Sequence, residues 1–435
     1  MSRKEAPRRI GFWDLLFLTV GGQSPFLSIL IYGTATIMLV GAYGFVAVLL
    51  GTLLALVNGL VVYYLSGKFT KSGGYYTYAF YGLSKRFGFE TGWAYLLYSS
   101  FYGAAYVLGA AWALSKVLPI GYWALSALIF AAMALVLLLG IKPTFSYALF
   151  ASVLEIATMA YIAVYLWWRS GFILFSPFTA KVSPSQLMLA ALLGSAIPTG
   201  YGSAVPLAGE VKDPKRTVKR VVMSVILLGG LLAAFDVYAI TAYLTSAGLS
   251  ATAGTVVDVI KGIGDVALIA IVIFASLNDG VVSSMAYATA FSRTLFAMAQ
   301  HGYMPELLSR YEARRGPVFS ILLSIGVMAA VVFGSLYSLH SAYLAFEVAG
   351  VLSMLGNVFV HIVANASLLR ISLKRAWRRV GQIALSGAAL AFSFYVFASS
   401  LASTQPLIVY AFLAWLLLGF ILIELITIAR EEEEE

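Results

Sequence analysis

The sequence contains no cysteine and few charged residues. None of its 435 residues is Cys, only 3 are His, and 11% are Asp, Glu, Lys or Arg. The lack of cysteine excludes disulfide bonds, thiolate metal sites and a cysteine nucleophile. Because soluble proteins carry roughly 25% charged residues, the low charge content excludes an ordinary soluble domain.

Residues for enzymatic chemistry are also scarce. The sequence has no G-x-x-x-x-G-K-[ST] phosphate loop and no H-E-x-x-H pair, and its histidines, His301, His340 and His361, are scattered. We therefore expect no cofactor, no metal site and no intramembrane enzyme, which would need a nucleophile with a base or a set of metal ligands. The energy for any pumping would come from an ion gradient or from exchange.

What the chain does contain is apolar sequence. Hydrophobic residues make up 61% of it, and the mean hydropathy is +0.92. A hydrocarbon core of about 30 Å is crossed by roughly 18 to 25 apolar residues. We place twelve such spans, at 12–38, 45–65, 92–115, 119–140, 145–168, 186–208, 219–244, 266–297, 318–336, 342–369, 380–400 and 406–428. The expected fold is an all-α integral membrane protein with twelve transmembrane helices in the lipid bilayer.

The distribution of basic residues predicts the orientation. With the N-terminus inside, all but four of the 28 Lys and Arg residues fall in cytoplasmic segments; the four are Lys116, Arg169, Lys181 and Lys261. This bias follows the positive-inside rule, so we expect a multi-pass protein of the cell membrane with both termini in the cytoplasm. Anionic inner-leaflet lipid explains the net charge of +9, and no nucleic-acid partner is expected.

The first span is interrupted near its middle by "TVGGQSPFLS" (19–28). Glycine costs roughly 1 kcal/mol and proline about 3 kcal/mol in a helix interior. Ser24 followed by Pro25 is typical of an N-cap followed by the first residue of a helix. We therefore expect two half-helices, at about 12–20 and 25–38, joined by unwound residues 21–24. The alternative is a simple proline kink.

The sixth span carries a second interruption, "SAIPTGYGSAVP" (195–206), with Ser203 as a candidate N-cap. Both interruptions fall in the first helix of a block of five spans, and an odd number of spans inverts the second block relative to the first. Paired broken helices in two inverted halves indicate the central site of a transporter. The expected domains are a first repeat at 1–168, a second repeat at 169–371, and two C-terminal helices with an acidic tail at 372–435.

Four segments resemble motifs of the amino acid/polyamine/organocation (APC) superfamily of transporters. They are "GGQSPF" in the first span, "SGGYYTYAFYGLSKRFGFETGW" (72–93), "TGYGSAVPLAGEVKDPKR" (199–216) and "FSRTLFAMAQHGYMP" (291–305). The resemblance implies a 5+5 inverted-repeat fold with discontinuous helices 1 and 6, and alternating-access transport of amino acids or related amines. Two departures concern the substrate: Pro25 removes a backbone donor, and Gly202 stands where an acidic residue often follows the aromatic one.

The broken helices are the expected binding site for a small-molecule substrate. No Lys or Arg lies near a span centre, so we expect free N–H groups of Phe26 and Leu27, at a half-helix N-terminus, to meet a substrate carboxylate. Carbonyls freed at the two breaks would hold the ammonium group. Tyr201 matches the family's aromatic position and is expected to be pocket wall and gate, whereas Tyr102 could be packing instead. The candidate residues are Gly21, Gly22, Gln23, Ser24, Phe26, Pro198, Thr199, Gly200, Tyr201, Gly202, Ser203 and Tyr102.

Coupling is expected to involve Glu155, an intramembrane carboxylate in the middle of the fifth span. Its position matches one where several proton-coupled members of the family carry a lysine. The favoured function is proton-coupled amino acid symport. The alternatives are a sodium ion held with Ser283 and Ser284, and a purely structural, protonated Glu155.

Three further acids leave another alternative open. Asp236, Asp279 and Glu347 lie in spans 7, 8 and 10, and the sequence suggests no basic partner for any of them. They could line a vestibule for a cationic amino acid or polyamine, carried by a transporter or an exchanger, or they could occupy wet helix ends. A passive channel or facilitator is the alternative from a different class. Neither the identity of the substrate nor the oligomeric state follows from the sequence.

Overall fold

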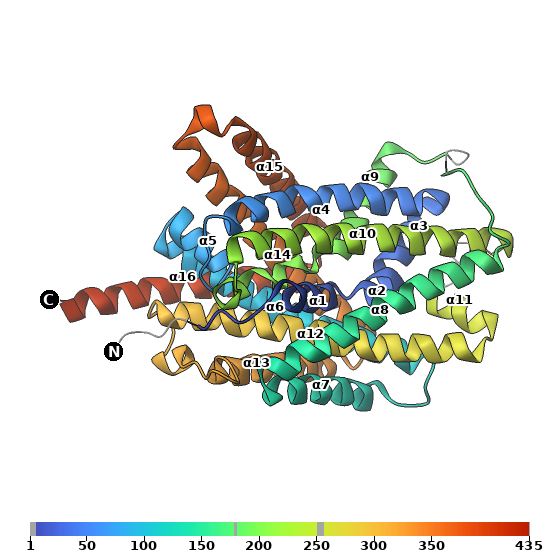
Figure 1. Ribbon diagram of the computed structural model, residues 1–435, viewed down its shortest axis with the longest axis horizontal. Coiled ribbons are helices and arrows are strands. Elements are labelled where there is room, and N and C mark those ends of the chain that lie inside the picture. The colour runs from blue at the N-terminus through green and yellow to red at the C-terminus, as the bar shows by residue number, and fades with distance from the viewer. Residues whose placement is uncertain (1–5, 178–180, 250–255, 435) are drawn as a thin grey trace.

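The computed structural model describes residues 6–177, 181–249 and 256–434, and in these ranges the chain is helical with no strand. The helices form one elongated bundle in which most run along the long axis (Figure 1). Two isolated bridges, Ile10 with Val211 and Glu312 with Gly316, are its β-type pairings. The all-α architecture is as expected from the composition.

Most helices lie within the expected apolar spans, and two short ones, at 75–82 and 256–263, lie between them. The long ones are α4 (Gly44–Ser66), α6 (Lys85–Ser115), α7 (Tyr122–Leu139), α8 (Ile141–Arg169), α10 (Pro214–Ser246), α12 (Val266–Gln300), α13 (Val318–Leu339), α14 (Ala342–Leu373), α15 (Val380–Ser403) and α16 (Pro406–Glu434). Shorter ones are α1 (Phe12–Gln23), α2 (Pro25–Ser28), α3 (Thr34–Val40), α5 (Tyr75–Gly82), α9 (Pro184–Ser195) and α11 (Val256–Ile263).

Ten stretches of the described chain are long and apolar enough to cross a membrane. One of them, Phe12–Ser66, covers the first two expected spans, and α6, the expected third span, does not qualify by composition. The protein is thus a multi-pass membrane protein, while the count of twelve spans and the division into two inverted repeats stay predictions.

The centre of the bundle is α6, which packs along both α12 and α14. Most of its residues are buried, and it carries four of the buried tyrosines, Tyr95, Tyr98, Tyr102 and Tyr106. The first helix, α1, packs against α8, α10 and α12. The interrupted helices are therefore held in the middle of the molecule.

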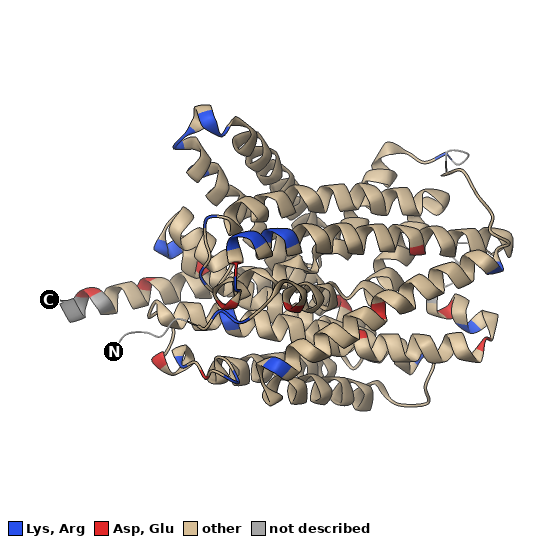
Figure 2. Ribbon diagram, viewed as in Figure 1, with Lys and Arg blue, Asp and Glu red and all other residues tan. Residues whose placement is uncertain are grey.

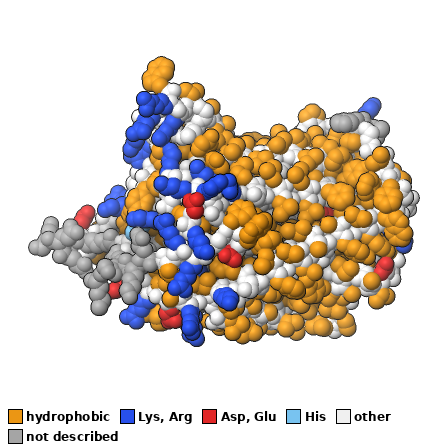
Figure 3. All heavy atoms as spheres, viewed as in Figure 1, with side chains coloured by type: hydrophobic (Ala, Val, Ile, Leu, Met, Phe, Trp, Pro, Cys, Tyr) orange, Lys and Arg blue, Asp and Glu red, His pale blue; other side chains and the backbone are white. Residues whose placement is uncertain are grey.

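Basic side chains gather at one end of the bundle, the end that carries both termini (Figures 2 and 3). We call this the basic end. One buried ion pair lies there, with Arg293 Nε 2.8 Å from Glu210 Oε1 and both side chains at most 3% exposed. Tyr311 donates a 3.0 Å hydrogen bond to the other Glu210 oxygen, and burial is the main reason that the pKa of this phenol is raised above its ordinary value.

The last helix, α16, is attached through a pair of tryptophans. The rings of Trp93 and Trp415 stack at 4.3 Å, and each indole N–H donates to the backbone carbonyl of the other residue, at 2.8 and 3.1 Å. The expected acidic tail continues α16 as far as Glu434, and Glu435 lies outside the described residues.

Candidate functional site

The first helix is broken at a single residue. α1 ends at Gln23, Ser24 adopts a left-handed conformation with φ 50° and ψ 57°, and α2 restarts with Pro25 at its first position. The expected break, with Ser24 and Pro25 as N-cap and first helical residue, is confirmed. The expectation that residues 21–24 are all unwound is wrong.

Close packing explains why positions 21 and 22 of this helix are glycine. A Cβ on Gly22 would lie 2.6 Å from Ser203 Oγ, and a Cβ on Gly21 would lie 3.0 Å from Ser152 Oγ. These residues are therefore glycine because neighbouring segments approach the helix closely. Beyond α2 the helix continues as a π-type turn, η1 (Ile29–Gly33), and then as α3.

The new helix N-terminus is capped by two carboxylates. Phe26 N donates to Glu155 Oε1 at 3.1 Å, and Leu27 N donates to Asp279 Oδ2 at 2.8 Å. The expectation that these N–H groups are free is therefore wrong. Ser24, although it is the N-cap residue, makes no side-chain capping bond. The positive end of the helix dipole, which was expected to attract a substrate carboxylate, is occupied by the protein's own acids.

Glu155 from α8 and Asp279 from α12, here called the acid pair, are 1% and 0% exposed. The second oxygen of each, Glu155 Oε2 and Asp279 Oδ1, is buried without a hydrogen-bond partner, as are Ser24 Oγ and Ser283 Oγ. Among the described residues, no Lys, Arg or His bonds to either carboxylate. Two adjacent buried carboxylates are stable only if a proton or a bound cation neutralises part of their charge.

The second interruption is longer than the first. α9 ends at Ser195, and residues Ile197–Ser203 (η4) and Val205–Glu210 (η5) form tight 3₁₀ turns, with Pro198 outside helical geometry. The expected restart of an α-helix behind Ser203 is wrong, since Ser203 Oγ donates to the Gly200 carbonyl instead. Prolines 198 and 206 remove the N–H groups that a continuous helix would need.

The two breaks touch each other. A Cβ on Gly200 would overlap the backbone N and Cα of Gln23 and would lie 2.5 Å from the carbonyl carbon of Gly22. We call this contact the crossing. Gln23 is fixed on its other side, because its Nε2 donates to the Val225 carbonyl of α10 at 2.9 Å.

Tyrosines of α6 join the crossing to a cavity. Tyr102 OH donates to the Gln23 carbonyl at 3.4 Å, and Tyr106 OH bonds to Ser28 Oγ at 2.9 Å. Tyr95 OH donates to the Gly202 carbonyl at 3.0 Å. Two of these bonds are accepted by backbone carbonyls at the breaks, those of Gln23 and Gly202.

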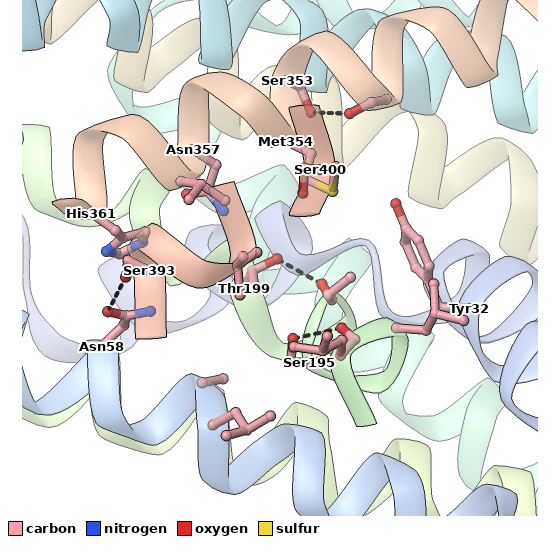
Figure 4. Close-up of a pocket in the computed structure, with 18 of the residues that line it drawn as sticks. Tyr32, Asn58, Ser195, Thr199, Ser353, Met354, Asn357, His361, Ser393 and Ser400 are labelled. Carbon is pink, nitrogen blue, oxygen red and sulfur yellow. Dashed lines mark hydrogen bonds between the residues drawn. The ribbon is translucent and has the colours of Figure 1, made fainter. Parts of the chain in front are cut away.

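The cavity has a volume of about 310 Å³ and lies between η1, α4, α6, α9, η4, α14 and α15 (Figure 4). Its walls are mostly leucines, tyrosines and serines, and no Asp, Glu, Lys or Arg is among the lining residues. His361 lines the cavity, and its Nε2 is hydrogen-bonded to Tyr75 OH at 3.4 Å and to Tyr201 OH at 3.3 Å. The cavity therefore offers hydrogen bonds and apolar surface without a formal charge.

The expected substrate-binding residues divide into two groups. Thr199, Tyr201 and Tyr102 line the cavity. The others are buried at or beside the crossing and do not line it: Gly21, Gly22, Gln23, Ser24, Phe26, Pro198, Gly200, Gly202 and Ser203. Their roles in binding stay predictions.

The expected coupling residues are also separated. Glu155 lies at the first break, as described, and Ser283 follows Asp279 by one turn of α12. Ser284 bonds to its own helix, at the Gly280 carbonyl. Asp236 is buried on α10 with one unpartnered oxygen, and Glu347 on α14 is exposed.

Sequence reasoning did not pair Asp279 with Glu155 and did not assign Asn58, Tyr106 or α15 to the site. A signal was present for Asp279, because an acid inside an apolar span is functional by default. No pattern in one sequence shows that two such acids on different helices cap consecutive amides.

Comparison with known proteins agrees with this architecture. The family model described as "Amino acid permease", of the APC superfamily, matches residues 14–423. The chain is similar to the uncharacterized transporters Mb2022c of Mycobacterium bovis and Rv1999c of Mycobacterium tuberculosis. Each is 26% identical over 388 residues, which cover 85% of this chain and 81% of the relative. The protein is thus a membrane transporter rather than an enzyme, and the chain belongs to the amino acid permease family.

Proposed function

We propose that the protein is a secondary active transporter that moves an amino acid past the crossing by alternating access. Transport of the amino acid is coupled to movement of a proton. The observation that carries the proposal is the acid pair, whose two carboxylates cap consecutive amides of the broken first helix. Family membership supports transport of an amino acid. We further propose that the basic end faces the cytoplasm.

The acid pair is suited to proton coupling because no cationic side chain among the described residues pairs with either carboxylate. Two carboxylates held against one helix terminus repel each other when both are ionised, so a single proton shared by them stabilises the pair. Loss of that proton on one side of the membrane would weaken the contact of α8 and α12 with the first helix. The buried site would then convert a change in protonation into movement of the break.

The same short segment receives the substrate. Gln23 and Ser28, on either side of Ser24, bond to the cavity-lining Tyr102 and Tyr106. Proton binding and substrate binding thus act on residues 23–28, and each would shift the same conformational equilibrium. Reciprocal coupling between two ligands requires such a shared two-state element.

Sodium is the second candidate for the coupling ion. The unpartnered oxygens of Glu155, Asp279, Ser24 and Ser283 are hard donors of the type that such a cation binds. A cationic amino acid or polyamine as substrate has less support, since the cavity is lined by no acidic residue.

The test is uptake of a labelled amino acid into proteoliposomes under an imposed proton gradient, with Glu155→Gln, Asp279→Asn and the control Glu347→Gln. We expect the wild type and the control to accumulate substrate, and both acid-pair variants to lose accumulation while retaining counterflow. Equal accumulation by Asp279→Asn would remove the pair from coupling. Dependence on a sodium gradient at fixed pH would replace the proton by sodium, and uptake that neither saturates nor shows counterflow would indicate a passive channel.

A further inference from the structure

The cavity has a wall that lies outside the ten helices of the expected repeats. α15 contributes Phe392, Ser393, Val396, Ser399, Ser400 and Ser403 to its lining. Positions 393, 396, 400 and 403 are spaced by three or four residues and so lie on one face of the helix. Ser393 and Ser400 are buried on this face, whereas Phe394 and Tyr395 on other faces are exposed. α15 therefore turns a hydroxyl-bearing face toward the cavity and an aromatic face away from it.

Asparagine side chains fix this wall against the bundle. Asn365 Nδ2 donates to Asn58 Oδ1 at 3.0 Å and to Ser393 Oγ at 3.1 Å, joining α14, α4 and α15. Asn58 and Ser393 both line the cavity, and Figure 4 shows them beside His361. A hydrogen-bonded contact among three helices gives the cavity a defined far boundary.

Two polar atoms next to this boundary lack partners. His361 is 4% exposed, and its Nδ1 is buried without a hydrogen bond. Asn357, one turn earlier on α14, has an equally unpartnered Oδ1. A buried polar atom without a hydrogen-bond partner is destabilising. Both residues line the cavity, so turning these side chains toward a ligand at this end would give each buried atom a partner.

The remaining walls set the class of that ligand. Leu54, Leu193, Met354 and Val396 supply apolar surface, and the lining contains no Asp, Glu, Lys or Arg that could pair with a charged group. A buried charge without a partner is disfavoured by several kcal/mol. The volume of about 310 Å³ is at the lower end of pockets that hold complete small molecules, so it accommodates more than the backbone of an amino acid.

We propose that the cavity between α4, α14 and α15 is a side-chain subsite for large, uncharged amino acids that carry a hydrogen-bonding group at their far end, such as a carboxamide or a phenol. α15 sets the size limit, and Asn357 with His361 recognises the polar end. This inference rests on the proposed function and names its substrate class. It makes α15 part of the binding site and not only a peripheral helix.

The first test changes the size of the subsite in the full-length protein. Val396→Phe fills the α15 wall, and Ala398→Phe places the same ring on an exposed position that does not line the cavity. In counterflow with reconstituted protein, we expect Val396→Phe to raise the KM for glutamine and tyrosine about tenfold or more, on the scale of a pocket contact worth 1–3 kcal/mol. The KM for alanine should change less than about twofold, and Ala398→Phe should behave as wild type. Equal effects of Val396→Phe on alanine and tyrosine would overturn the role of α15.

The second test addresses the polar end with matched substrates. Wild type should prefer glutamine to methionine and tyrosine to phenylalanine, and should exclude glutamate and lysine. Asn357→Leu should reduce both preferences by about tenfold, as expected for one lost hydrogen bond. Leu344→Met, at an exposed position of α14 that does not line the cavity, should retain them. Preference for a charged amino acid, or unchanged preferences in Asn357→Leu, would overturn the proposal.

The two proposals fail in different ways. Proton-driven accumulation of alanine together with no side-chain preference would refute the subsite and leave the transport mechanism intact. Selective counterflow without any response to a proton gradient would refute proton coupling and leave the subsite intact. Counterflow of no amino acid at all would refute both.

Discussion

Gly200 is the residue at which the two broken helices touch, and replacing it with alanine tests that geometry. The added Cβ would overlap the backbone of Gln23 and lie 2.5 Å from the carbonyl carbon of Gly22. Ordinary carbon contacts are about 3.5–4.0 Å, so the segments must separate by roughly 1 Å. Because the obstructing atoms are backbone atoms, no side chain can rotate away to relieve the overlap.

The expected cost of Gly200→Ala is at or above the upper part of the usual 1–3 kcal/mol for overpacking a buried site. Separation of the breaks would also lengthen the Tyr102 bond to the Gln23 carbonyl, which is already 3.4 Å. We therefore expect both a lower melting temperature in detergent and a loss of most amino acid uptake in proteoliposomes.

Gly202→Ala, two residues away, is the matched control. Its Cβ would approach Tyr98 Oη at 3.3 Å and meet no backbone atom that close. The phenol can shift by a few tenths of an ångström, so this variant should stay close to wild type in stability. Wild-type stability and uptake in Gly200→Ala would refute the contact between the breaks, and equal damage in both variants would refute its dependence on backbone overlap.

Three other substitutions test the packing around the site. Gly51→Ala should lower the melting temperature by the equivalent of about 1–3 kcal/mol, because its Cβ would lie 2.5–2.6 Å from backbone of α9, whereas Gly326→Ala meets nothing within 4 Å and should have little effect. Trp415→Phe should cost about 0.5–1.5 kcal/mol in thermal unfolding, since the ring remains but the indole N–H that bonds to α6 is lost; an unchanged melting temperature would contradict this attachment of α16. Glu210→Gln should reduce the yield of folded protein in size-exclusion chromatography, since breaking a buried ion pair costs about 3–5 kcal/mol, and Arg293→Met in the same chain should restore part of it.

The parts of the fold that the sequence predicts are those set by local chemistry. Long apolar runs predict the membrane helices, and Ser24 followed by Pro25 predicts the restart of the first helix because proline lacks the N–H that an N-terminal residue does not use. The extent of the break is not local. Gly21 and Gly22 have low helix propensity, yet both are helical, and Ser152 and Ser203 from other parts of the chain pack against them.

The site is predictable only in part, for a related reason. An acid in an apolar span indicates a functional residue, so Glu155 and Asp279 could each be chosen from the sequence as candidate site residues. Their joint role depends on α8 and α12 both contacting one helix terminus, and a single sequence does not predict that contact. The serines of α15 gave still less signal, since serine is common in membrane helices and its spacing does not show what the helix faces.

In the proposed mechanism, the coupling proton and the substrate act on the first break through two separate sets of contacts. None of the cavity-lining residues lies on α8 or α12, the helices that supply the acid pair. The cavity reaches the break through tyrosines of α6, and the acids reach it through the amides of Phe26 and Leu27. Ser24 lies between these two sets of contacts. It adopts a left-handed conformation, which is unfavourable for residues other than glycine. In the proposed mechanism, a change in either set of contacts would therefore act on the residues directly beside Ser24.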